Sequence, residues 1–365
     1  MFTKSAVLAL ILVCSSASTK AQVRPPTLDP TPATGQQTLL IQEGVAQHDR
    51  GNYDAAIKLY EEALRENPNN VEALYELSFS YSMKKDYLRS LETAYKGAQY
   101  KSRMLAGFYM QIGNNLDQLG EPKKSIEVYK AGIKLLPKMN LLHYNLAVTY
   151  RRMGRADEAR KALKQAIVIN PNHPGSHAVL SALWHEGHYK TPALLAACRF
   201  LVLEPGSERA AGALKIVQEV MGAGVTEGSS PDTINIFVDT SAKKDEGDFT
   251  ALDVVLAMGK AASMAESKKG KSEMQLLVRQ FETFFAIMSE QSDKADRNKF
   301  TWKFYVPYFA EMKQKNYVEP FVYYISQSSG NQEALKWLAD KKALVGDFLA
   351  WSKLYNWPET EVIDR

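Results

Sequence analysis

Four of the chain's six histidines, His173, His177, His185 and His188, lie in the stretch HPGSHAVLSALWHEGH. Imidazole is the commonest metal ligand among side chains, so the stretch raises the question of a metal site and of catalysis. HEGH lacks the HExxH spacing that places two histidines on one helical face for zinc. His177 and His185 are eight residues apart, about 12 Å along a helix. We expect no four-histidine centre and no bound metal, although a two-histidine site and ordinary structural positions both stay open.

The elements that must position these histidines repeat about every 34 residues. When the repeats are aligned, small residues occupy two equivalent positions in every unit, and a proline, or in one unit a serine, occupies a third position at the end of the unit. We call each set of equivalent positions a column. The columns are Gly44, Ser78, Gly113, Ala147, Ser181; Ala56, Ser90, Ser125, Ala159, Ala193; and Pro68, Ser102, Pro137, Pro171, Pro205. Fixed spacing in three columns indicates a repeat architecture.

Each unit reads as a helical hairpin. Apolar residues recur at intervals of three and four, as in Ala56, Leu59, Tyr60 and Ala63, which predicts a helix with one buried face. Gly51, Gly120 and Gly154 interrupt the two helices of their units, where a tight turn needs a residue without a side-chain penalty. The small columns allow the two helices to approach closely, and the prolines end the second helix.

The stretch GNYDAAIKLYEEALRENP, residues 51–68, resembles the tetratricopeptide repeat family. The resemblance covers residues 37–206 as five units: 37–70, 71–105, 106–139, 140–173 and 174–206. Unit two departs from the family, since Lys85 stands where a glycine is usual, and unit five places Gly187 one position early. The resemblance implies an all-α solenoid whose first helices line a concave groove that binds a peptide or a protein.

The family's geometry also implies which side chains face the groove. The strongest candidates are Tyr75, Phe79, Met110, Asn114, Tyr144, Asn145, Val148, Arg151 and Arg152. Ile41, Gln42, Val45, His48, Glu76, Gln111 and Asp117 share these faces.

Several roles stay open for these candidates. The three aromatic rings could anchor a peptide or pack against a C-terminal helix that fills the groove. Asn114 and Asn145 could hold a terminal carboxylate, but Met110, Gly175 and Val179 stand where basic partners are expected. Arg151 and Arg152 form either a solvated helix end or an anion site.

The 34-residue period ends after Pro205. One more helix and a Gly/Ser linker are expected over 207–231, followed by a helical C-terminal domain over 232–365. This half holds 20 of the chain's 37 aromatic residues, which predicts a dense core, with a ligand pocket as the alternative. TINIFVDTS alternates like a strand without a visible partner, so we expect at most one short strand and favour a loop. Asp239, Asp245, Glu246, Asp248 and Asp253 are expected in a solvated acidic loop.

The ends and the composition bound the class of protein. Lys4, an apolar run and a small polar tract predict a signal peptide over 1–21, followed by a proline-rich leader over 22–36. Without residues 1–21 the formal charge falls from +4 to +2, which gives no indication of nucleic-acid binding. Only Cys198 then remains, so no internal disulfide can form. No later stretch is long and uncharged enough to cross a bilayer.

We therefore expect an exported, non-enzymatic adaptor or scaffold of the cell envelope, in the periplasm or at the cell surface. Its partner is a protein or peptide, no cofactor is expected, and the oligomeric state is open. The alternative is an enzyme, or a small-ligand or glycan-binding protein, with its site in the C-terminal domain. No histidine or cysteine follows Cys198, and no nucleophile elbow or phosphate loop appears there.

Overall fold

The structure is a computed structural model that describes residues 25–229, 233–237, 244–267, 269–292 and 298–358 of the 365-residue chain. The expected signal peptide over 1–21 lies outside these residues. The chain divides into two compact units, Met1–Arg155 and Ala156–Arg365. The division falls inside the fourth repeat, so the two helices of that repeat belong to different units. None of the helices in the described ranges is both long and apolar enough to span a membrane.

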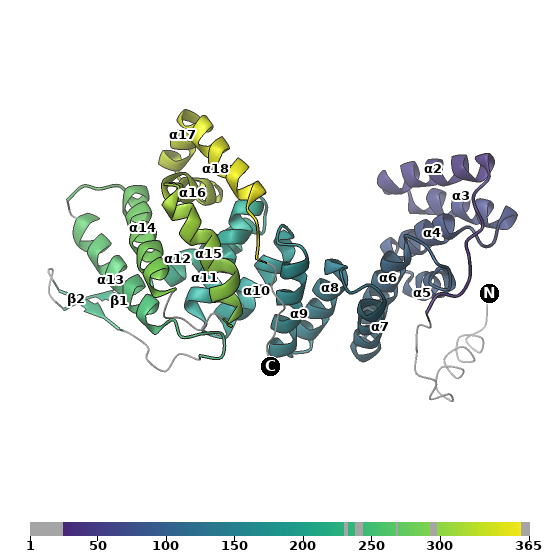
Figure 1. Cartoon of the computed structure of the whole chain (residues 1–365). Coiled ribbons are helices and arrows are strands. Elements are labelled where there is room, and N and C mark those ends of the chain that lie inside the picture. The colour runs from purple at the N-terminus through teal and green to yellow at the C-terminus, as the bar shows by residue number, and fades with distance from the viewer. Residues whose placement is uncertain (1–24, 230–232, 238–243, 268, 293–297, 359–365) are drawn as a thin grey trace. The chain divides into compact units, whose positions relative to one another are not determined.

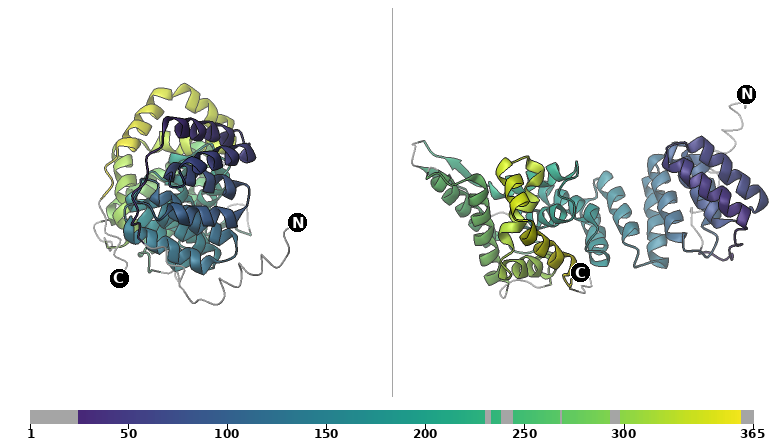
Figure 2. Two further views of the ribbon diagram at one scale, coloured as in Figure 1. Left: turned by 90° about the vertical axis from the view of Figure 1, so that its right-hand side faces the viewer. Right: turned by 90° about the horizontal axis from the view of Figure 1, so that it is seen from above.

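The N-terminal unit is a series of antiparallel helical hairpins (Figures 1 and 2). Its helices are α2 (Gly35–Asp49), α3 (Tyr53–Glu66), α4 (Val71–Met83), α5 (Tyr87–Gly97), α6 (Leu105–Gln118), α7 (Pro122–Leu135) and α8 (Asn140–Arg152). The capping box of Thr34 and Gln37 starts α2, and the side chain of Asn70 caps α4. The first helix of each hairpin also contacts the first helix of the next.

The small columns are buried as the sequence predicts. Gly44 and Gly113 are buried, and a Cβ atom on either would lie 2.4 Å from a ring atom of Tyr60 or Tyr129. Ser78, Ala147 and Ser181 are fully buried, as are all five residues of the second column. α3, α7, α9 (Ala156–Ile169) and α11 (Lys190–Leu203) each end two residues before the proline predicted to end the second helix.

The proline-rich leader has defined contacts where it is described. Leu28 forms an isolated parallel β-bridge with Tyr100, and the amide of Lys101 donates to the carbonyl of Leu28 at 2.8 Å. This part of the leader is therefore extended and packs against the end of the second repeat, residues 71–105.

The C-terminal unit continues with helices. These are α9, α10 (Pro174–Glu186), α11, α12 (Ala210–Met221), α13 (Thr250–Ser267), α14 (Glu273–Gln291), α15 (Phe300–Gln314), α16 (Val318–Ile325), a 3-10 turn at Gln327–Ser329, α17 (Gln332–Asp340) and α18 (Lys342–Leu354). The predicted aromatic core is present: Phe281, Phe285, Phe309 and Phe321 are fully buried with ring centroids 5.2 to 5.9 Å apart. Lys341 is both the C-cap of α17 and the N-cap of α18, so these two helices meet there.

Two sequence expectations for this unit are wrong. The segment expected to be a loop, or at most one short strand, forms β2 (Ile234–Ile236), which pairs antiparallel with β1 (Val225–Glu227) inside the Gly/Ser linker. The expected solvated acidic loop is partly buried: Glu246 and Asp253 are 4% and 8% exposed. Asp239 lies outside the described residues. Glu246 accepts from Arg160 Nε at 3.1 Å and from Lys164 Nζ at 2.6 Å, so the loop carries a buried ion-pair cluster.

Candidate protein-binding surface

The four clustered histidines have four separate structural roles. His173 caps α10, with its Nδ1 accepting from the amide of Ser176 at 3.2 Å. His185 lies 3.1 Å from a carboxylate oxygen of Glu219, and His188 occupies a left-handed turn at φ 65°. Among the described residues, no three His, Cys, Asp or Glu side chains are grouped so that they could hold a metal ion.

His177 is fully buried and is bonded on both ring nitrogens. Nε2 lies 2.9 Å from the carbonyl of Pro171, and Nδ1 lies 2.7 Å from the hydroxyl of Tyr305. A carbonyl only accepts, so Nε2 carries the proton and Nδ1 of the neutral ring accepts from Tyr305. Burial, aided by the positive charge of Arg199, lowers the pKa of His177 to about 3. This histidine is a neutral packing residue, which is the ordinary structural position that the sequence left open.

The nine candidate groove residues lie on α4, α6 and α8, all within the N-terminal unit. Along each helix they recur three or four residues apart, so they share one helical face. Between helices they recur every 34 or 35 residues, which produces two rows. The inner row is Tyr75, Met110 and Tyr144, and each of its side chains is half-buried, as is that of the neighbouring Asn145. The outer row is Phe79, Asn114 and Val148, and each of its side chains is exposed.

The exposed outer row offers two apolar contacts with a polar group between them. Phe79 and Val148 are each 38% exposed. One face of Phe79 stacks on the His48 ring at 4.8 Å, which fixes the phenyl group. Asn114 Oδ1 accepts from the buried Tyr129 hydroxyl at 2.5 Å. The amide nitrogen of Asn114 has no hydrogen-bond partner among the described residues and is free to donate.

Tyr75 packs within the repeats themselves. Its ring contacts Phe108 edge-on at 5.5 Å and fills the space beside Gly107, where a Cβ atom would lie 2.4 Å from the ring. Phe108 is fully buried. Tyr75 is therefore a contact between neighbouring units, and its truncation would disturb packing as well as any groove.

Polar bonds also join successive first helices at the repeat spacing. Ser82 donates to Asn115 at 2.7 Å, and Gln111 accepts from Ser78. Arg152 forms an ion pair with Asp117 of the preceding first helix. The charge of Arg152 is thereby already matched, while Arg151 is exposed and Tyr144 is half-buried. The sequence indicated that these positions face one side, but side-chain pairing between units was not visible in it.

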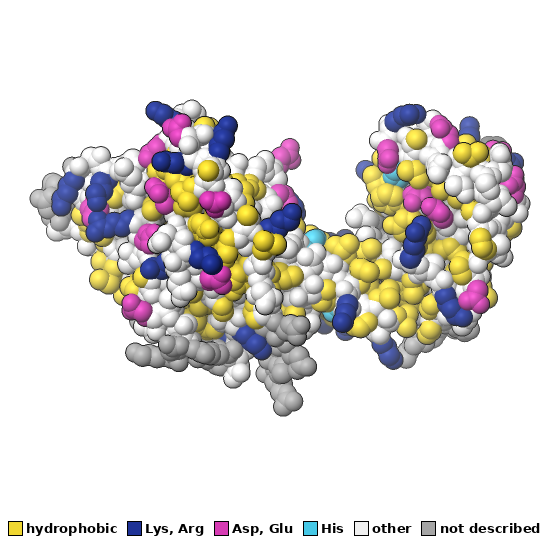
Figure 3. Space-filling view, turned by 45° about the horizontal axis from the view of Figure 1, so that its top comes forward, with side chains coloured by type: hydrophobic (Ala, Val, Ile, Leu, Met, Phe, Trp, Pro, Cys, Tyr) yellow, Lys and Arg dark blue, Asp and Glu magenta, His cyan; other side chains and the backbone are white. Residues whose placement is uncertain are grey.

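A group of carboxylates flanks the face at its α4 end. Burial raises the pKa of Glu76, and the nearby negative charges of Glu72 and Asp49 raise it further. Charge in this region is therefore unbalanced and favours a cationic neighbour. On the side drawn in Figure 3, hydrophobic side chains of the N-terminal unit lie at the surface between charged side chains.

Comparisons with known proteins identify the repeats. A TPR repeat model matches residues 44–84, and tetratricopeptide repeat models match 106–138 and 141–173. These residues form a tetratricopeptide repeat segment, as the resemblance of residues 51–68 to that family implies.

One curated relative is the TPR repeat-containing protein MJ1428 of Methanocaldococcus jannaschii, 25% identical over 119 residues. The match spans 33% of this chain and only 21% of that protein.

Similar solved structures include TTC0263, a thermophilic TPR protein of Thermus thermophilus, with 24% identity and a TM-score of 0.43. That match covers 50% of this chain and 98% of TTC0263. YrrB, described as a TPR protein with an unusual peptide-binding site, has 16% identity and a TM-score of 0.38, covering 48% of this chain and 90% of YrrB.

Proposed function

We propose that the protein is a non-enzymatic adaptor whose α4, α6 and α8 face binds an extended segment of a partner protein. The observation that carries the proposal is the outer row, Phe79, Asn114 and Val148, which is exposed at the repeat spacing while the equivalent inner row is half-buried. A row of exposed apolar groups with a free amide between them suits a chain that offers apolar side chains and backbone carbonyls.

The charges specify the partner further. Glu76, crowded by Glu72 and Asp49, favours a lysine or arginine in the segment that lies over α4. At the α8 end, Arg152 is paired with Asp117, so its charge is already matched, and Met110 stands where a carboxylate clamp would have a basic side chain. The proposed ligand is therefore an internal segment with apolar residues and at least one basic residue.

Selection from a displayed random-peptide library on the full chain tests this proposal. We expect enrichment of sequences that combine a basic residue with apolar ones. A Phe79→Ala, Val148→Ala variant should bind the selected peptide at least about tenfold more weakly, because a few anchor side chains carry most of the binding energy of such interfaces. Glu76→Gln should reduce the preference for the basic residue.

The matched control is Leu88→Ala on α5, because Leu88 is 62% exposed but lies on a second helix. Its affinity should equal that of the unchanged chain. If the double variant bound the peptide as tightly as the unchanged chain, the peptide would contact another surface. The same conclusion would follow if Leu88→Ala lost as much affinity as the double variant.

We also propose that the protein is exported to the cell envelope. The proposal rests on the order of Lys4, the apolar run and the small polar tract in the first residues. Mass spectrometry of the protein from fractionated source cells should find it in the envelope with an N-terminus near Gln22. Recovery from the cytosol with residues 1–21 intact would contradict export.

A further inference from the structure

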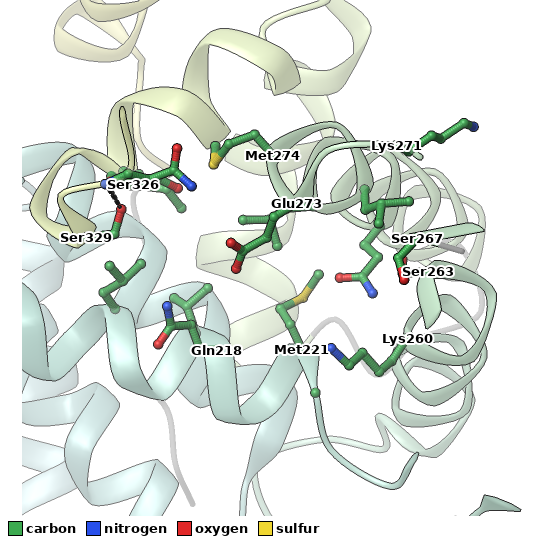
Figure 4. A pocket seen from close by; sticks show the side chains of 18 of the residues that line it. Gln218, Met221, Lys260, Ser263, Ser267, Lys271, Glu273, Met274, Ser326 and Ser329 are labelled. Carbon is green, nitrogen blue, oxygen red and sulfur yellow. Dashed lines mark hydrogen bonds between the residues drawn. The ribbon is translucent and has the colours of Figure 1, made fainter. Parts of the chain in front are cut away.

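The C-terminal unit contains a cleft with a volume of about 660 Å³, formed by α12, α13, α14 and the turn before α17 (Figure 4). This volume lies within the range of sites that hold small organic ligands. Its floor is apolar, with buried Leu214, Val217, Met221, Met274 and Ile325. Methionine is flexible and polarizable, so such a floor accepts apolar groups of varied shape.

No aromatic residue lines the described part of the cleft, although the surrounding half of the chain is rich in them. Nucleobases are commonly held by stacking on aromatic rings, and the flat faces of sugars use similar surfaces. The aromatic residues of this unit instead fill its core. The cleft therefore does not suit the glycan ligand that the composition left open.

Opposite charges face the cleft from two helices. Figure 4 shows Lys260 of α13 and Glu273 of α14 extending into the same space, with Gln218 of α12 beside them. None of these three side chains forms a hydrogen bond or ion pair with the part of the chain that the structure describes. Lys271, by contrast, is paired with Glu266 at 2.9 Å. Lys260 and Glu273 are thus available to a ligand.

We propose that this cleft binds a short peptide that has free ends and an apolar side chain. Lys260 receives the terminal carboxylate, and Glu273 receives the terminal ammonium group. The amides of Gln218 and Gln280 each offer a donor and an acceptor, which match a peptide group. The methionine-rich floor receives the apolar side chain.

Other ligand classes match fewer of these groups. An aliphatic carboxylate would use Lys260 and the floor but would leave Glu273 facing an anionic or apolar molecule. A nucleotide would lack a stacking ring, and its phosphates would meet Glu273. The zwitterionic peptide uses both charges, the amides and the floor together. The site lies wholly in the C-terminal unit and does not depend on the face of α4, α6 and α8.

Calorimetric titration of the full chain with the tripeptide Ala-Leu-Ala tests the proposal, alongside its N-acetylated and C-amidated forms. Each blocked form should bind the unchanged protein about fivefold more weakly, as expected for losing one partly exposed ion pair. Lys260→Gln should no longer distinguish the acid from the amide but should still discriminate against the acetylated form. Glu273→Gln should show the converse.

The control variants are Lys215→Gln on α12 and Glu290→Gln on α14, which change the same charges at exposed positions outside the cleft. Both should retain the full pattern of discrimination. Absence of tripeptide binding at millimolar concentration would overturn the proposal, as would discrimination that survives in the two cleft variants. Binding of decanoate without binding of the tripeptide would overturn it too, because the cleft would then be an aliphatic-anion site.

Discussion

At the scale of single residues, the hairpin turns all adopt the same left-handed conformation. Gly51, Gly120 and Gly154 have φ values of 81°, 77° and 72°, while Lys85 and His188 occupy the equivalent turns at 62° and 65°. A side chain in this region costs about 1 kcal/mol relative to glycine. The second and fifth repeats therefore keep the family's turn geometry although they lack its glycine, and the backbone at Lys85 and His188 is strained.

Lys85→Gly should stabilise unit two by about 1 kcal/mol, because glycine adopts this conformation without strain. Gly51→Ala is the converse change, since no atom lies within 4 Å of its added Cβ and only the backbone conformation opposes it. It should destabilise unit one by a similar amount. Hydrogen exchange of α5 measures the effect of Lys85→Gly, and that of α3 measures the effect of Gly51→Ala. Faster exchange of α5 in Lys85→Gly than in the unchanged chain would contradict this explanation.

His177 should make the protein less stable in mild acid. Its pKa of about 3 in the folded chain lies below the ordinary value of 6.5, so the unfolded chain binds a proton more readily between these values. Stability is therefore complete above pH 6.5 and falls as the pH drops toward 3. The fall is at most about 1.4 kcal/mol per pH unit.

Urea denaturation at pH 7 and pH 5 should show this fall in the unchanged chain and a smaller one in His177→Gln, which has no titrating ring. Equal pH dependence in the two proteins would assign the effect to other groups.

At the scale of elements, residues 244–249, which precede α13, are fixed to α9 by buried charge. Glu246, Arg160 and Lys164 have side chains that are 5%, 9% and 3% exposed. Glu246→Ala should destabilise the C-terminal unit by about 3 kcal/mol, because it leaves two buried cations without this partner.

The neighbouring Asp245→Ala is the control. Asp245 is 56% exposed and also lies near Arg160, at 3.5 Å. Its loss should cost less than about 1 kcal/mol, because solvent screens an exposed ion pair. Thermal unfolding of both variants measures the difference. Comparable losses would show that burial does not govern this cluster.

The sequence predicted local repeats far better than long-range pairs. Hairpins, turns and small columns follow from residues that are close in sequence or one repeat apart, and all are present. Glu246 lies 86 residues from Arg160, so no local sequence pattern predicted their ion pair. β1 spans only Val225–Glu227, which is too short for an alternating pattern to indicate a strand. The candidate groove face was predicted from the geometry of the family that the repeats resemble. The packing of Tyr75 and the pairing of Arg152 required side-chain positions.

At the scale of the whole molecule, the two proposed binding surfaces belong to different compact units and make different chemical demands. The α4, α6 and α8 face suits an internal segment with a basic residue, whereas the cleft requires two free ends. Blocking both ends of a selected peptide should therefore leave its binding to the groove face unchanged.

The central claim is that the outer row on α4, α6 and α8 contacts the partner. Hydrogen exchange of the full chain with and without a selected, end-blocked peptide tests it most directly. We predict slower exchange in α4, α6 and α8 that is lost in the Phe79→Ala, Val148→Ala variant and kept in Leu88→Ala. Protection confined to α12, α13 and α14, or protection unchanged in the double variant, would contradict the claim.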